Sequence, residues 1–150
     1  MTVTRTVALV TILAAAACVQ PTVAAAPVAP AHVAASFGRT WNAVIDELSQ
    51  RTIPIKTLDR SSGFVAAEVA TVPPNDLGTY TTDCGGFMAA MIHSTGPGVA
   101  NYNIVVRGDS SASTVKVTLS VMQGGAKCTT KGTFETAMQD EIKAQAEATK

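Results

Sequence analysis

The stretch Thr40 to Val72, TWNAVIDELSQRTIPIKTLDRSSGFVAAEVATV, contains the pattern that decides the fold. Its first part predicts an amphipathic helix over residues 37–50. Apolar residues at positions i, i+3, i+4 and i+7 share one face of this helix, namely Trp41, Val44, Ile45 and Leu48. Polar residues form the opposite face, which we expect to contact water: Asn42, Asp46, Glu47, Ser49 and Gln50. Ser36 is the expected N-cap, and Pro54 prevents the helix from continuing.

The second part of the stretch predicts a β-hairpin. Ile55–Asp59 is the first strand, and because its two large aliphatic residues have opposite parity we expect a β-bulge within it. The turn ends at Gly63, which can adopt a positive φ without steric cost. Phe64–Val72 is the second strand, and Pro73 ends it. An isolated hairpin is marginal in water, so we expect the helix to cover its apolar face.

A second hairpin and a closing helix follow. Ala100–Arg107 and Thr114–Gln123 alternate apolar and polar residues, which is typical of half-buried antiparallel strands. From Thr133 a helical pattern returns, with Thr133 as the expected N-cap and Glu135 in the first turn. The intervening segment, residues 73–98, is rich in glycine and proline. It predicts a long loop with one strand near 87–92.

These elements predict one α+β domain spanning residues 36–150, in which an antiparallel sheet of four or five strands packs against an N-terminal and a C-terminal helix. The 11 basic residues balance the 11 acidic residues, so the sequence does not indicate a nucleic-acid partner. Gly85-Gly86 is not followed by the Gly-Lys-Ser/Thr of a phosphate-binding loop. No cofactor is therefore predicted.

Residues 1–17 have the pattern of a signal peptide. Arg5 supplies a positive charge, and Val7–Ala17 is apolar apart from Thr11. This run is too short to cross a bilayer, which requires about 20 residues. The alternative for this segment is a buried N-terminal helix.

The end of this segment, Ala15-Ala16-Ala17-Cys18, resembles the lipobox of bacterial lipoproteins, although the lipobox more often has leucine at the position of Ala15. The resemblance implies that Cys18 becomes the acylated N-terminus, and that two or three acyl chains anchor the protein to a membrane. Because Val19 is not aspartate, it further implies the outer membrane, facing the periplasm. Cleavage within residues 23–26, which would release a secreted protein, is the alternative.

Residues 18–35 are rich in alanine, proline and valine and carry no Asp, Glu, Lys or Arg. This composition predicts a tether between the anchor and the domain. His32 lies within it, and we expect its side chain to be exposed and without a role.

The assignment of Cys18 to lipid leaves Cys84 and Cys128, which we expect to form a disulfide in an oxidising compartment. The bridge would close a loop of about 44 residues, and its stabilisation would be of order 4 kcal/mol in the chain-entropy model.

Two chemical alternatives use the same cysteine. Cys84 could be a nucleophile assisted by Asp83 and His93, but a neighbouring carboxylate raises a thiol pKa, and sequence neighbours rarely achieve the required geometry. Cys84, His93 and Cys128 have no recognised metal-ligand spacing.

Asp46 and Glu47 are adjacent in a helix and so do not face each other. No catalytic or metal-binding residue is therefore predicted.

The run Trp41-x-x-Val44-Ile45-x-x-Leu48, followed by Ile53-Pro54-Ile55 and Asp59-Arg60-x-x-Gly63, resembles a pattern of small bacterial envelope lipoproteins. It is most similar to the repeated domain of lipoprotein component C of the outer-membrane β-barrel assembly machinery. The resemblance implies a helix-grip-like α+β fold, and it transfers no functional residue.

The function expected from these features is that of a membrane-anchored envelope lipoprotein acting as a non-enzymatic accessory or interaction module with an envelope protein partner. The alternative is a soluble, secreted protein that binds a small ligand in an apolar cavity lined by Trp41, Val115 and Val117.

Overall fold

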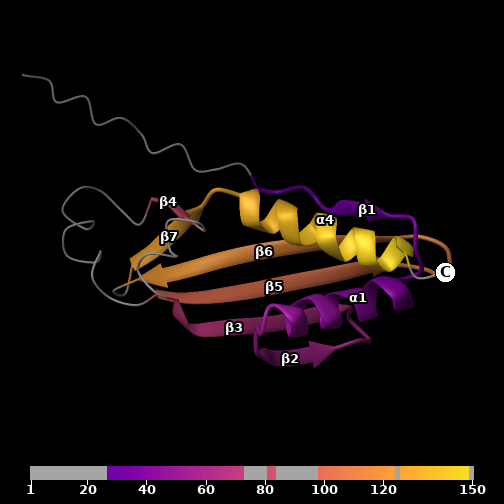
Figure 1. Cartoon of the computed structure of the whole chain (residues 1–150), viewed down its shortest axis with the longest axis horizontal. Helices are drawn as coiled ribbons and strands as arrows, with labels where there is room; N and C mark the ends of the chain where they lie inside the picture. The colour runs from indigo at the N-terminus through magenta and orange to yellow at the C-terminus, as the bar shows by residue number, and fades with distance from the viewer. Residues whose placement is uncertain (1–26, 73–80, 84–97, 124–125, 149–150) are drawn as a thin grey trace, which may run out of the picture.

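The computed structural model describes residues 27–72, 81–83, 98–123 and 126–148. Two helices pack against one face of a seven-stranded antiparallel sheet (Figure 1). In chain order the elements are β1 (Ala31–Val33), α1 (Phe37–Gln50), β2 (Ile55–Asp59), β3 (Phe64–Val72), β4 (Thr81–Asp83), β5 (Gly98–Gly108), β6 (Ser113–Gln123), β7 (Ala126–Thr130) and α4 (Thr133–Ala148). The predicted α+β class and the two covering helices are confirmed.

The sheet has more strands than the four or five expected. Its order is β2-β3-β5-β6-β7-β4, and β1 pairs with β6 outside this path. The additional strands β1, β4 and β7 have only three to five residues each. Such short strands show too few alternations for a period of two to be recognised in the sequence. The strand expected near residues 87–92 lies outside the described residues.

The first hairpin agrees with its prediction. The register between β2 and β3 shifts between Ile55 and Thr57, as expected for a bulge. Gly63 has a φ of 63°, and a Cβ atom at this position would lie 2.2 Å from the carbonyl oxygen of Val106. The Gly63 carbonyl in turn accepts a hydrogen bond of 2.9 Å from the Val106 amide. Gly63 therefore joins this hairpin to β5.

The core lies between the helices and the central strands. Alternate residues of β5 and β6 face it, as their sequence pattern predicts, and the apolar stripes of both helices complete it. Its largest fully buried members include Leu48, Tyr102, Ile104, Val115, Val117, Met138 and Ile142. α1 packs mainly on the central strands β5 and β6, whereas every residue of β2 is exposed. The expected covering of the first hairpin by α1 is therefore wrong for β2, and only β3 contributes buried residues such as Val65 and Ala67.

Both helices begin close to the predicted residues. The Ser36 side chain caps α1 and accepts a 3.4 Å hydrogen bond from the Arg39 amide. Thr133 was expected to cap α4 but is its first helical residue, because the Gly132 carbonyl already accepts a hydrogen bond from the Thr136 amide. No helix in the described part of the chain is long and apolar enough to span a bilayer.

The assignment of residues 18–35 to a tether is wrong at its C-terminal end. Val33 and Ala35 are 2% and 0% exposed, and β1 pairs with residues 113–115 of β6. Small uncharged residues suit a sheet edge as well as a linker, so their composition did not distinguish the two. The folded domain therefore begins before residue 36, although His32 is exposed as expected.

Candidate functional site

The two helices form a groove on the outer side of the molecule. They lie side by side over the same face of the sheet (Figure 1). Two adjoining hollows of about 460 and 390 Å³ lie along them. We call these hollows together the helix groove. It is lined by Arg39, Asn42, Ala43, Asp46, Glu47, Gln50 and Arg51 of α1 and its C-cap, and by Glu141, Ala144, Gln145 and Ala148 of α4.

The groove follows from the sequences of the two helices. The large apolar residues of α1 and α4 face the sheet, which leaves polar side chains on their outer faces. Where the helices adjoin, alanines such as Ala43 and Ala148 contribute little volume. The space above them is therefore left open to solvent.

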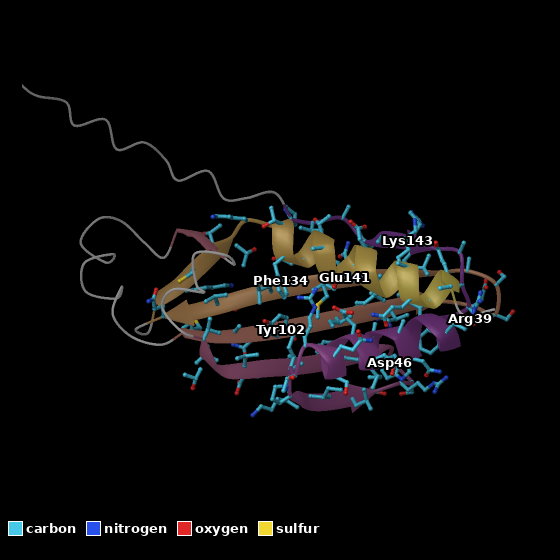
Figure 2. The ribbon with its side chains drawn as sticks, viewed as in Figure 1. Arg39, Asp46, Tyr102, Phe134, Glu141 and Lys143 are labelled. Atoms are coloured by element: carbon cyan, nitrogen blue, oxygen red, sulfur yellow. The ribbon has the colours of Figure 1, made fainter. Side chains whose placement is uncertain are left out.

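A hydrogen-bonded cluster at one end of the groove, Glu47, Arg51, Glu141 and Gln145, connects the helices; we call it the polar clasp. Arg51 forms ion pairs through Nε with Glu47 Oε1 and through an Nη atom with Glu141 Oε2. Gln145 Nε2 donates a hydrogen bond of 2.8 Å to Glu47 Oε2. The side chain of Glu47 is only 4% exposed, whereas that of Glu141 is 52% exposed. Figure 2 shows Glu141 on α4, with Asp46 on the neighbouring α1.

The two carboxyl groups of the clasp titrate differently. Burial raises the pKa of Glu47, and a hydrogen bond with Glu141 raises it further, against the lowering effect of Arg51. The pKa of Glu141 is lowered, first by its hydrogen bond with Glu47 and then by its hydrogen bond with Arg51. A proton entering the pair is therefore held preferentially by Glu47.

The clasp also contacts the aromatic part of the core. The Arg51 guanidinium carbon lies 5.2 Å from the centre of the Phe134 ring, a cation–π distance. The Phe134 ring centre lies 5.8 Å from that of Tyr102 on β5 (Figure 2). Arg51 is thereby positioned by both helices and by the sheet.

Glu47 corrects one expectation from the sequence. It was assigned to the water-facing side of α1, but α4 packs beside α1 and buries it. The spacing of Glu47 and Arg51 at i and i+4 was visible in the sequence and is compatible with an ion pair. Their partners Glu141 and Gln145 lie about 90 residues later, and no local pattern indicates them.

Of the three cysteines to which the sequence assigned a role, only Cys128 lies within the described part of the chain. Cys128 on β7 is 3% exposed and disulfide-bonded. Cys18, Cys84 and His93 lie outside the described residues, so the pairing of Cys128 with Cys84 stays a prediction. The register supports it, because Asp83, which precedes Cys84 in the sequence, pairs with Thr129, which follows Cys128.

The described residues show no group of three or more His, Cys, Asp or Glu side chains that could hold a metal ion. A second buried acid, Glu135, lies at the start of α4. Its Oε1 accepts a 2.7 Å hydrogen bond from Thr130, and its Oε2 has no hydrogen-bond partner among the described residues. Glu135 also borders a hollow of about 130 Å³. This hollow is much smaller than the helix groove.

No protein-family model matches the chain, and no curated protein is similar to it.

Proposed function

We propose that this protein is a membrane-anchored envelope lipoprotein that acts as a non-enzymatic interaction module. The observation that carries this proposal is the disulfide bond of Cys128. Disulfides persist in oxidising compartments such as the bacterial periplasm and are rare in the cytosol. A thiol held in a disulfide is also unable to act as a nucleophile or as a metal ligand.

The helix groove favours binding at the surface of the domain over binding in its interior. Trp41, Val115 and Val117, which would line an internal apolar cavity, are 4%, 0% and 1% exposed. A cavity large enough for water would leave part of their surface accessible, so within the described part of the chain no such cavity lies against these three side chains. For this reason we favour an interaction module over a binding protein for a small apolar ligand.

The anchor in this proposal is Cys18, acylated after removal of residues 1–17. Eight residues, 19–26, separate Cys18 from Pro27, the first described residue, and the stretch from Cys18 to Pro27 spans at most about 32 Å. The domain would therefore remain close to the membrane surface. The absence of aspartate after Cys18 favours the outer membrane, facing the periplasm, and the resemblance to component C of the β-barrel assembly machinery suggests an envelope protein as partner.

The anchor is tested by substitution of Cys18. We expect Cys18→Ala to abolish labelling by a palmitate analogue and to move the protein from the membrane to the soluble fraction. Cys84→Ser is the matched control and should remain in the membrane fraction. Globomycin, which blocks lipoprotein signal peptidase, should cause the precursor to accumulate. Unchanged processing and fractionation of Cys18→Ala would contradict the anchor.

A further inference from the structure

The pairing between β1 and β6 stops short of the register that it could follow. It reaches Ala31, which lies opposite Val115. If this register continued by two residues, Ala29 would lie opposite Val117 and the two would bond through their backbones. Pairing along the same edge of β6 resumes only at Val121, with β7. Within the described part of the chain, no strand therefore lies beside β6 between these two short strands.

A side chain of α4 takes the place of the missing backbone bond. Gln139 is 3% exposed, and its Oε1 accepts a 2.8 Å hydrogen bond from the Val117 amide. Its Nε2 donates a 3.0 Å hydrogen bond to the Ala29 carbonyl. A primary amide offers both a donor and an acceptor, as a peptide group does. Gln139 therefore stands between β6 and residues 27–30, which we call the N-terminal strap.

The space next to this bridge gives the strap room to move. The hollow of about 130 Å³ is lined by Pro27 and Val28 of the strap and by residues 116–119 of β6. Of the four strap residues only Val28 is partly buried, and the other three are exposed. Little packing therefore holds the strap at its present distance from β6.

A second partner for Gln139 lies four residues earlier on the same helix. Glu135 is 4% exposed and also lines the hollow. Its Oε1 accepts a hydrogen bond from Thr130, whereas its Oε2 has no partner among the described residues. Side chains four residues apart on a helix are neighbours, so the Gln139 amide can turn to Glu135. The oxygen then left without a donor is a neutral amide oxygen, which is less costly to bury than a carboxylate oxygen.

We propose that Gln139 is a two-position latch for the N-terminal strap. In the first position, which the structure shows, its amide bridges Val117 and Ala29. In the second position the amide donates to Glu135 Oε2, and the strap closes onto β6. The two backbone groups that the latch releases then bond directly to each other, so the movement leaves neither of them unpaired. The switch goes beyond the function proposed above and does not depend on an anchor at Cys18.

The test is NMR spectroscopy of the isotopically labelled full chain. In the first position, a scalar coupling across the hydrogen bond joins the Val117 nitrogen to the side-chain carbonyl carbon of Gln139. In the second position, the coupling joins the Val117 nitrogen to the Ala29 carbonyl carbon. We expect the wild type to show the first coupling, together with microsecond-to-millisecond relaxation dispersion at Ala29 and Val117. Gln139→Ala removes the first position, so the second coupling should appear and the Val117 amide should stay protected from hydrogen exchange.

Three further variants make the result specific. Glu135→Ala removes the acceptor of the second position and should abolish the dispersion, whereas Glu135→Gln retains an acceptor and should preserve it. Gln145→Ala is the matched control, because Gln145 bridges α4 to Glu47 in the polar clasp, and it should leave the dispersion unchanged. The proposal would be overturned by rapid exchange of the Val117 amide in Gln139→Ala without the second coupling. A wild type without dispersion, or dispersion that persists in Glu135→Ala, would also overturn it.

Discussion

At the scale of single residues, the structure places acidic side chains in opposite surroundings. Asp59 is fully exposed and accepts hydrogen bonds from the turn residues Ser61 and Ser62. Asp109 does the same for Ser111 and Ala112 in the turn between β5 and β6. Glu47, in contrast, is buried in the polar clasp between two helices. The turn sites of Asp59 and Asp109 stabilise the ionised carboxylate, whereas the buried site of Glu47 disfavours ionisation.

Asp59 should contribute to acid sensitivity. Hydrogen bonds from the Ser61 and Ser62 side chains lower the pKa of Asp59 to about 2 from its ordinary 3.8. Its stabilisation is therefore fully present above the unfolded value and is lost as the pH falls toward 2. We expect Asp59→Asn to show a smaller loss of stability over this range than the wild type, measured by urea denaturation. Ser61→Ala should likewise reduce the loss of stability at low pH. If both variants lose as much stability as the wild type, the hydrogen bonds of the turn do not lower the pKa of Asp59.

Glu47 should have the opposite pH dependence. Its pKa is raised by burial, so its contribution to stability is fully present below the ordinary value of 4.5 and is lost as the pH rises through the folded value. Glu47→Gln removes this ionisation and should gain stability relative to the wild type as the pH increases from about 4.5 to about 7. Urea denaturation at several pH values measures the difference. If the difference in the free energy of unfolding between the variant and the wild type does not change with pH, burial does not disfavour the ionisation of Glu47.

The size of the clasp's contribution is measured by truncation. Glu47→Ala removes the buried acceptor of the Arg51 and Gln145 side chains and should cost about 1–3 kcal/mol of the free energy of unfolding. Glu47→Gln retains an acceptor for Arg51 and should cost less. Asp46→Ala, on the adjacent exposed position, is the matched control and should change stability by no more than about 0.5 kcal/mol.

At the scale of elements, the junction of the first hairpin with β5 depends on Gly63. Gly63→Ala would place a Cβ atom 2.2 Å from the Val106 carbonyl oxygen at a φ of 63°, and backbone must move to relieve this. We expect a loss of about 2 kcal/mol or more. Gly38→Ala in α1 meets only the flexible end of Arg60, at 3.5 Å, and should be neutral or stabilising by about 0.5–1 kcal/mol. Similar destabilisation in both variants would contradict this account.

The longer elements could be predicted from the sequence because each contains enough repeats of its own period. The alternation in β6 and the helical stripe of α1 are examples. The strand β7 follows β6 directly but is too short for its alternation to be recognised, whereas β1 pairs with residues of β6 that are distant in the sequence and that no local pattern indicates. The groove was missed for the same reason. Asn42, Asp46 and Gln50 were correctly assigned to the exposed face, but only the position of α4 makes this face one wall of a groove.

At the scale of the whole molecule, the disulfide of Cys128 fastens one end of the sheet. We expect reduction to lower the free energy of unfolding by up to about 4 kcal/mol if the closed loop runs from Cys84, and less if the bridge is strained. Cys84→Ser and Cys128→Ser should then have equal effects. Peptide mapping of protein purified without reductant identifies the partner. Recovery of Cys84 as a free, alkylatable thiol would contradict the predicted pairing.

The way the N-terminal segment is attached has a mechanical consequence. Gln139 Nε2 donates to the Ala29 carbonyl, the Ala34 amide donates to Glu147, and β1 between them pairs with β6. A pulling force on a lipidated N-terminus would act on these hydrogen bonds first. It would separate the three residue pairs between β1 and β6 before it reached the central strands. Detachment of β1 would expose the edge of β6 at residues 113–115, leaving unpaired backbone that another extended chain could occupy.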